Sequence, residues 1–176
     1  DESFDPDYRA DRVLWDGELV EGPGWTLQAV ATPGHTSNHL CFALPESGAL
    51  FSGDHVMGWS TSIVSPPDGD MGAYVASLQT LLLRDEHVYY PAHGPVVDDP
   101  RKLVRGLILH RKQREAGILA ELRGGETQIG AIVANLYPAV DPRLHPAAAR
   151  SVLAHLIDLE KRGLVQAEGE AWSVRE

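Results

Sequence analysis

The order of strand-like and helix-like segments is the feature that most restricts how this chain can fold. Residues 12–54 read as short apolar strands separated by turn signals, residues 71–82 repeat apolar side chains at helical spacing, and residues 88–90 form another short apolar run. Strands that alternate with helices favour a sheet with helices packed on it. We therefore expect an α/β domain in the first part of the chain.

Turn and capping residues set the predicted borders inside this part. Asp16-Gly17 is expected to close a tight hairpin turn, because glycine accepts positive φ, and Asp70 is expected to cap the helix. The predicted strands lie at residues 13–15, 25–30, 40–44 and 49–51, with a buried strand at 88–90 that ends at Pro91.

From Asp98-Asp99-Pro100 onward the sequence is mainly helical. These residues can open a long helix that runs to about Leu122 and stops at Gly124-Gly125. Two helices and a hairpin follow: a helix over 128–136 capped by Thr127, a helix over 147–162 opened by Pro146, and two strands around the turn Glu168-Gly169-Glu170. Helices followed by a hairpin are typical of a winged helix. The chain thus divides into a domain over residues 1–122 and a small winged-helix-like domain over 123–176.

Charge argues against a nucleic-acid surface. The net charge is −10, and the helix over 147–162, which would enter a DNA groove, mixes Arg150, Lys161 and Arg162 with acidic Asp158 and Glu160. A DNA reader usually concentrates positive charge there. We expect no binding to duplex DNA, a small-molecule substrate, and a tail whose outward positions serve packing or oligomerisation.

Location and redox chemistry are constrained by what the sequence contains. It has no run of about 18 apolar residues, and its acidic beginning resembles neither a signal nor a transit peptide, so no membrane partner and a cytoplasmic location are expected. Its single cysteine, Cys41, cannot form an internal disulfide. Because Cys41 sits in an apolar run, we expect an inert, buried thiol.

Three short loops carry the residues most suited to chemistry. They are Thr32-Pro33-Gly34-His35-Thr36, Ser52-Gly53-Asp54-His55 and Pro91-Ala92-His93-Gly94, each at the end of a predicted strand and each with glycine beside a His or Asp. Glycine allows a sharp turn, and imidazole nitrogens and carboxylates are ligands that zinc accepts. His35, Asp54 and His93 are therefore expected to converge at one edge of the sheet.

In this order and spacing, the three loops resemble the later ligand motifs of the metallo-β-lactamase superfamily. The run from Ser52 to Leu78, which includes residues 66–71, the stretch 110–115 and the helical tail resemble its β-lactamase-like 2 branch in particular. The resemblance implies the C-terminal part of an αββα sandwich followed by a winged helix. It also implies two zinc ions, with His35 on the first, His93 on the second, and Asp54 bridging both as the catalytic group. His55, Trp59 and His110 are candidate pocket residues.

One motif of the family is absent from the sequence. Members carry an earlier His-x-His-x-Asp-His motif that supplies further ligands, and no such motif occurs among these residues. Three donors are too few for two zinc shells of four ligands. We therefore expect an incomplete chain that alone binds zinc weakly and is inactive, and that associates with a missing N-terminal segment or forms a homo-oligomer.

Three functions are compatible with this sequence. The first is hydrolysis of an ester, thioester or related acyl substrate by a metal-bound hydroxide. The second is a metal-dependent endoribonuclease on single-stranded RNA, which the resembling branch allows and the acidic charge makes less attractive. The third is a non-enzymatic winged-helix interaction module. Fold and ligands alone do not name the substrate.

The remaining histidines receive structural interpretations. His39 is expected to be packed or to support the ligands from behind, and His55 either lines a pocket with Trp59 or is structural. On the long helix His110 should stack over Arg114 and Arg111 over Glu115, giving either a solvated ion-pair face or a substrate-facing one. No function is assigned to His87, His145 or His155, the last of which is expected on a helix surface.

Overall fold

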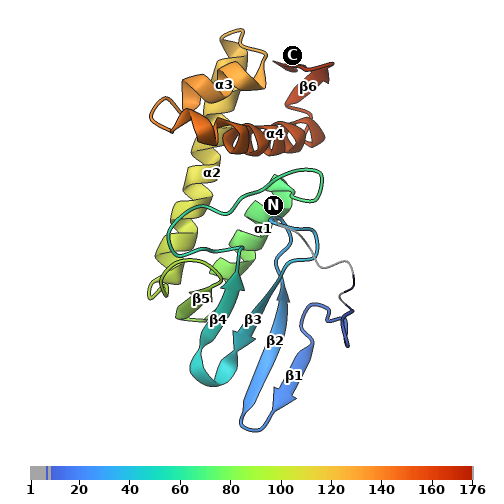
Figure 1. The fold of residues 1–176 in the computed structure, drawn as a ribbon, viewed down its shortest axis with the longest axis vertical. Helices are drawn as coiled ribbons and strands as arrows, with labels where there is room; N and C mark the ends of the chain where they lie inside the picture. Colours follow the sequence, from blue (N-terminus) through green and yellow to red (C-terminus); the bar gives the residue numbers. More distant parts are fainter. Residues whose placement is uncertain (1–6, 8, 176) are drawn as a thin grey trace.

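The protein has two parts joined by one long helix (Figure 1). The computed structural model describes residues 7 and 9–175. In the first part, five strands form one sheet in sequence order: β1 (Leu19–Gly22), β2 (Trp25–Ala31), β3 (Leu40–Leu44), β4 (Ala49–Gly53) and β5 (Val88–Pro91). Helix α1 (Met71–Leu82) connects β4 to β5, and helix α2 (Pro100–Arg123) leads to the second part. The predicted α/β architecture is confirmed.

Strand directions bring the three predicted ligand loops to one edge. β2 and β4 each pair antiparallel with β3, whereas β4 and β5 run parallel. β2, β4 and β5 therefore all end at the same edge of the sheet, and the loops after them begin at Thr32, Asp54 and Ala92. The parallel pairing follows from α1, because a helical crossover returns the chain to the edge where it started.

The first hairpin differs from the prediction. β1 and β2 are joined through Pro23 and Gly24, and Gly24 has a φ of 81°. Asp16-Gly17 also forms a tight turn, closed by a 3.1 Å hydrogen bond from Glu18 N to Trp15 O, but residues 13–15 are not a strand. The Asp16 carboxylate instead accepts from the N–H of Ala31 at 2.8 Å, so the turn supports the end of β2.

Gly17 provides a direct test of this turn. Its φ is 79° and an added Cβ would meet nothing within 4 Å, so only the backbone conformation opposes substitution. We expect Gly17→Val to lower the free energy of unfolding by about 1–3 kcal/mol, because a β-branched residue is strained at positive φ. Gly17→Asn, which tolerates that conformation, should cost much less. Urea unfolding of both variants checks this, and equal costs would exclude backbone strain as the cause.

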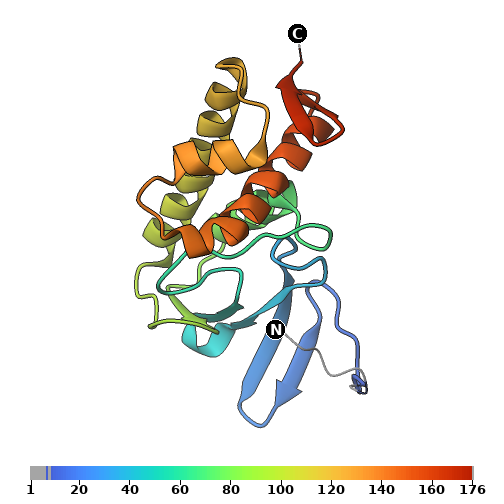
Figure 2. The ribbon, with the colours of Figure 1, turned by 45° about the horizontal axis from the view of Figure 1, so that its top comes forward.

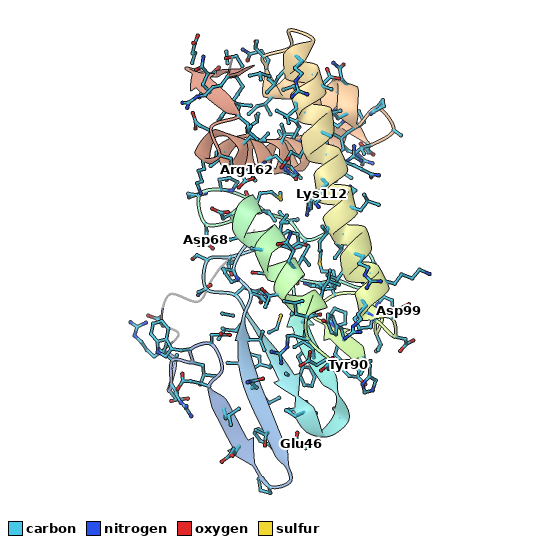
Figure 3. The ribbon with its side chains drawn as sticks, turned by 180° about the vertical axis from the view of Figure 1, so that it is seen from behind. Glu46, Asp68, Tyr90, Asp99, Lys112 and Arg162 are labelled. Carbon is cyan, nitrogen blue, oxygen red and sulfur yellow. The ribbon has the colours of Figure 1, made fainter. Side chains whose placement is uncertain are left out.

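One face of the sheet is covered by helices and the other is open. Seen from behind, α1 and α2 lie over the sheet (Figure 3), and the buried core between them includes Leu50, Tyr74 and Leu78. Figure 1 looks onto the opposite face, which no described helix covers. Phe51 and Tyr90 are exposed there, with ring centroids 5.7 Å apart. The strand predicted to be buried at 88–90 is therefore buried only at Tyr89.

The second part contains the predicted order of helices and hairpin. It consists of α3 (Ile129–Leu136), α4 (His145–Lys161), β6 (Val165–Glu168) and β7 (Ala171–Val174), packed around its own apolar cluster. Thr127 is not the cap of α3: Gln128 occupies that position without a side-chain hydrogen bond, and the Glu126 carboxylate instead accepts from the N–H groups of Thr127 and Gln128.

Helix α2 belongs to both cores. Val104, Leu107 and Ile108 pack in the first cluster, whereas Ile118 and Leu122 pack in the second. The division near Leu122 stays a prediction. Among the described residues, no helix combines the length and apolar character needed to cross a bilayer.

The basic residues of α4 face the first part of the protein. α4 lies across the end of α1 (Figure 2). Arg150 donates to Ser65 Oγ at 2.8 Å, Lys161 pairs with Asp70 at 2.6 Å, and Arg162 pairs with Glu115 at 2.5 Å. These side chains are exposed, as expected of outward positions, and each also pairs with an acidic or polar group on another element.

His155 of α4 is buried where α4 packs against α1 and α2, not on a helix surface as expected. It is 1 % exposed and neither ring nitrogen has a hydrogen-bond partner. Burial is the largest cause of its lowered pKa, from 6.5 to about 3, and positively charged Arg111 adds to the effect. The ring is therefore neutral in the folded protein.

The pKa of His155 predicts a loss of stability in acid. The unfolded chain takes up a proton near pH 6.5 and the folded chain does not, so this contribution is complete above pH 6.5 and is lost as pH falls toward 3. Between pH 6.5 and 5 the loss is about 2 kcal/mol at about 1.4 kcal/mol per pH unit. Urea unfolding against pH should show a slope to which His155 and the similarly buried His55 both contribute, and His155→Leu should remove about half of it. The same change at exposed His87 should not alter this slope. An unaltered slope in His155→Leu would contradict the assignment of the acid sensitivity to His155.

Candidate metal centre

The structure brings His35, Asp54 and His93 together at the edge where β2, β4 and β5 end. Asp54 lies between the two histidines: its Oδ2 is 3.7 Å from His35 Nε2 and its Oδ1 is 3.4 Å from His93 Nε2. The side chains remain partly accessible, His93 most and His35 least. The predicted convergence is thus observed, with each carboxylate oxygen facing a different imidazole.

A backbone carbonyl on the side away from Asp54 sets the orientation of the His35 ring. His35 Nδ1 lies 2.6 Å from the carbonyl oxygen of Ile63. A carbonyl can only accept, so Nδ1 carries the hydrogen and the lone pair of Nε2 points toward Asp54. A histidine that donates its second N–H to a carbonyl is the usual arrangement of a metal ligand, because the hydrogen bond fixes the tautomer.

His39 holds the backbone of Asp54 and is not a third histidine ligand. Asp54 N donates to His39 Nε2 at 3.3 Å, so His39 Nδ1 carries the hydrogen that it shares with Thr32 Oγ1 at 2.8 Å. Burial, followed by the nearby His35, holds the pKa of His39 below its usual value, while Asp54 opposes the shift. The predicted packed, supporting role of His39 agrees with these contacts.

Behind His39, Thr32 and Cys41 continue the buried contacts. Thr32 Oγ1 is 3.2 Å from Cys41 Sγ, and both residues are fully buried. Burial raises the pKa of the Cys41 thiol to about 11. The thiol therefore stays protonated near neutral pH, as the prediction of an inert core cysteine requires.

One carboxylate oxygen of the centre has no hydrogen-bond partner and could bind a cation. Asp54 Oδ1 is buried from solvent and accepts no hydrogen bond. A buried carboxylate oxygen without a hydrogen-bond donor is costly. A metal ion bound by this oxygen and by imidazole nitrogen would remove that cost.

The three donors do not form a ready-made cluster. Within the described residues, no group of three His, Cys, Asp or Glu side chains has the arrangement needed to hold a metal ion. His35 and His93 lie on opposite oxygens of Asp54, so each ion would take one histidine and one carboxylate oxygen from this set. Its other positions would be filled by water or by donors outside these three residues.

A cavity of 540 Å³ lies beside the centre and contains two of the three predicted pocket residues. Its walls come from residues 57–61 and from the first half of α2, and they include Met57, Trp59, Leu103, Leu107 and His110. Gly58 N donates to His93 O at 2.9 Å, so one wall is hydrogen-bonded directly to the ligand loop. The cavity is mainly apolar and open to solvent.

His55 does not line this cavity. It is fully buried, with its ring 4.7 Å from the ring of Tyr74 and 5.8 Å from that of His39. Burial lowers the pKa of His55 to about 3. Its position after Asp54 turns the side chain into the core, so the pocket assignment is wrong and the structural alternative is correct.

The predicted pairs on α2 are only half correct. Arg114 Nε donates to His110 Nε2 at 3.3 Å, as expected for residues four apart. Arg111 does not reach Glu115: it is 4 % exposed, and its guanidinium donates to the carbonyl of Ser62 at 2.5 Å. Helical periodicity identified the pair but not the packing of α2 against the loop before α1, which draws Arg111 inward.

Comparisons with known proteins identify the family. The sequence-family model of the metallo-beta-lactamase superfamily matches residues 2–93. The family model of the beta-lactamase associated winged helix domain matches residues 129–172. A metallo-beta-lactamase family protein from Thermus thermophilus is 27% identical with a TM-score of 0.80, covering 92% of this chain and 54% of its own. A beta-lactamase domain protein from Burkholderia ambifaria has a TM-score of 0.84 at 21% identity, over 98% of this chain and 54% of its own, which shows a shared fold.

Curated relatives include two fungal proteins. Lactamase-like protein nscB from Aspergillus fumigatus is 40% identical over 63% of this chain and 32% of its own length. Atrochrysone carboxyl ACP thioesterase AgnL7 from Paecilomyces divaricatus is 38% identical over 66% of this chain and 36% of its own. The chain spans about a third of the length of these relatives. It belongs to the metallo-β-lactamase superfamily and carries, after its sheet domain, a β-lactamase-associated winged helix domain.

Proposed function

We propose that this protein is a zinc-dependent hydrolase in which His35, Asp54 and His93 bind the metal and Asp54 bridges two ions. The observation that carries the proposal is the buried, unpartnered Oδ1 of Asp54 with a histidine nitrogen facing each carboxylate oxygen. Membership of a hydrolase-like superfamily supports the same chemistry.

When bound, zinc supplies an acidified water and polarises the group to be cleaved. The residues of this chain supply the geometry. The Asp54 carboxylate would hold the metal together with the two histidines. His35 presents Nε2 because the carbonyl of Ile63 holds Nδ1–H, and His39 accepts a hydrogen bond from the backbone N–H of Asp54. The partly open cavity, whose wall at Gly58 is hydrogen-bonded to the backbone of His93, would give the substrate an apolar place near the metal.

We propose an acyl thioester as the substrate. Two curated relatives carry the name atrochrysone carboxyl ACP thioesterase, one from Paecilomyces divaricatus and one from Pseudocercospora fijiensis. The cavity beside the centre suits an acyl group, since Met57, Leu103 and Leu107 line it. Zinc as the metal and a thioester as the scissile group are both proposed for the whole protein.

Release of thiol from the substrate by the zinc-loaded full-length protein tests it. An acyl-N-acetylcysteamine thioester should be hydrolysed, and Asp54→Asn, which keeps the shape but removes the charge, should abolish turnover. Asp98→Asn, a similar change on an exposed loop, should retain it. Cleavage of single-stranded RNA that depends on Asp54, with the thioester untouched, would instead support the endoribonuclease.

The non-enzymatic alternative receives less support. Arg150, Lys161 and Arg162 are engaged with Ser65, Asp70 and Glu115, which leaves α4 without the free positive charge expected of a DNA reader. That the protein does not bind duplex DNA stays a prediction.

A further inference from the structure

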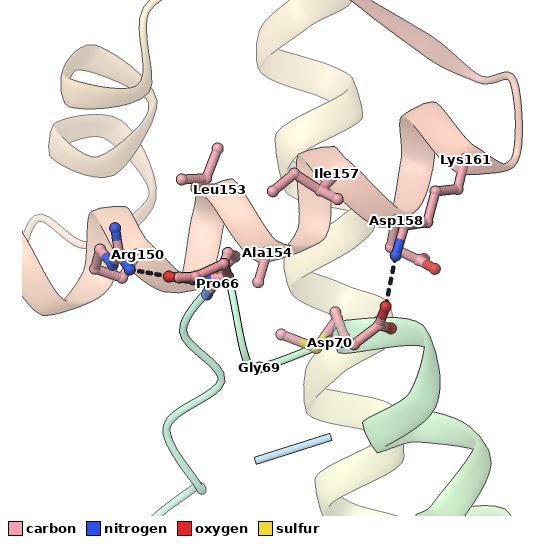
Figure 4. A pocket seen from close by; sticks show the side chains of 11 residues that line it. Pro66, Gly69, Asp70, Arg150, Leu153, Ala154, Ile157, Asp158 and Lys161 are labelled. Carbon is pink, nitrogen blue, oxygen red and sulfur yellow. Dashed lines mark hydrogen bonds and ion pairs between the residues drawn. The ribbon is translucent and has the colours of Figure 1, made fainter. Parts of the chain in front are cut away.

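Contacts from the second part of the protein reach the loop that orients His35. Ile63, whose carbonyl accepts the His35 hydrogen, lies in the segment between β4 and α1. On one side of Ile63, Arg111 of α2 donates to the carbonyl of Ser62 at 2.5 Å. On the other side, Arg150 of α4 donates to Ser65 Oγ at 2.8 Å and to the carbonyl of Pro66 (Figure 4). Arginine side chains therefore hold the backbone on both sides of the carbonyl that fixes His35.

A second line of contacts ends at the residue before His35. Lys161 of α4 pairs with the Asp70 carboxylate at 2.6 Å (Figure 4). The backbone N–H of Asp70 donates to the carbonyl of Gly34 at 3.0 Å, and the Asp70 carboxylate also caps α1 through Ala73 N. One residue thus links the second domain, the start of α1 and the turn that carries His35.

These contacts differ in strength. Arg111 is almost fully buried and also reaches Ser151 Oγ at 3.4 Å, so its charge-assisted bond to Ser62 is shielded from water. The pairs of Arg150 and Lys161 are partly exposed, and each alone is expected to contribute little. Because both end on the segment around His35, their effects should combine.

We propose that the winged-helix domain is a positioning part of the metal centre. Arg150 and Lys161, with Arg111 of the shared helix, fix Ile63 and Gly34 and thereby hold the His35 ring with its hydrogen on Nδ1 and its lone pair toward Asp54. The relevance to zinc rests on the proposed function, whereas the ring orientation can be measured without metal.

The test combines ring spectroscopy with zinc affinity. Long-range proton–nitrogen spectra of the 176-residue chain, at a pH where histidine is neutral, report which ring nitrogen of His35 carries the hydrogen. In Arg150→Met/Lys161→Met the Nδ1–H form should lose population, and the zinc dissociation constant, measured by competition with a chelator, should rise about tenfold, as for other losses of ligand support. Arg111→Lys keeps the buried charge but removes the planar guanidinium group. It should likewise lower the population of the Nδ1–H form and raise the zinc dissociation constant.

Arg143→Met is the matched control. Arg143 also lies in the second part of the protein but pairs with Asp141, so its loss should leave the His35 ring and zinc affinity unchanged. A His35 ring spectrum unaltered in the double variant, or altered equally in the control, would overturn the proposal. If the ring responds but wild-type protein binds no zinc through His35, the positioning role stands and the proposed function fails.

Discussion

Replacing Gly34 with alanine should be among the most damaging single changes in the first domain. Gly34 has a φ of 141°, and an added Cβ would lie 2.3 Å from Tyr74 Cα, where α1 passes against the loop. The backbone of a buried helix cannot move aside as a flexible side chain can. Conformational strain and overpacking together should cost about 3–5 kcal/mol of unfolding free energy.

Gly24→Ala separates the two causes. Gly24 also has positive φ, 81°, but an added Cβ would meet nothing within 4 Å. Its alanine variant should show the conformational cost alone, about 1–3 kcal/mol. Urea unfolding of the two variants measures the difference, and a Gly34→Ala cost no larger than that of Gly24→Ala would show that the close approach of α1 is unimportant.

Asp54→Asn should produce the second large effect, a loss of metal binding. The amide keeps the size of the carboxylate but removes the charge that two ions would share. Because loss of a supporting residue already weakens metal sites 10–100-fold, loss of the bridging ligand should reduce zinc affinity by about 100-fold or more.

Equilibrium dialysis with metal analysis checks this expectation. Asp98→Asn serves as the control, since it makes the same chemical change on an exposed part of the chain. Zinc bound equally well by Asp54→Asn and by the wild-type protein would place the metal elsewhere.

Local patterns predicted the elements that depend on nearby residues. β3 and the Asp70 cap of α1 agree with the expected positions, because an apolar run and a side-chain cap are local signals. The convergence of His35, Asp54 and His93 was also predictable, since glycine-flanked ligands at strand ends meet wherever those strands end at one edge.

The failures involve contacts between distant segments. Asp16-Gly17 and Pro23-Gly24 are both good turn sequences, and only the pairing of β1 with β2 decides which one closes the hairpin. Arg111 and His155 occupy ordinary helical positions, but packing between the two domains buries them. Helical spacing defines a face of a helix and does not say what will cover it.

The metal centre can be tested most directly by the ring nitrogen resonances of His35 and His93 during a zinc titration. We predict that Nε2 of His35 and of His93 shift together to positions typical of metal-bound imidazole, that His35 Nδ1 keeps its hydrogen, and that exposed His87 does not respond. Zinc that leaves both rings unchanged, or binds His35 through Nδ1, would contradict the assignment of these residues as the metal ligands.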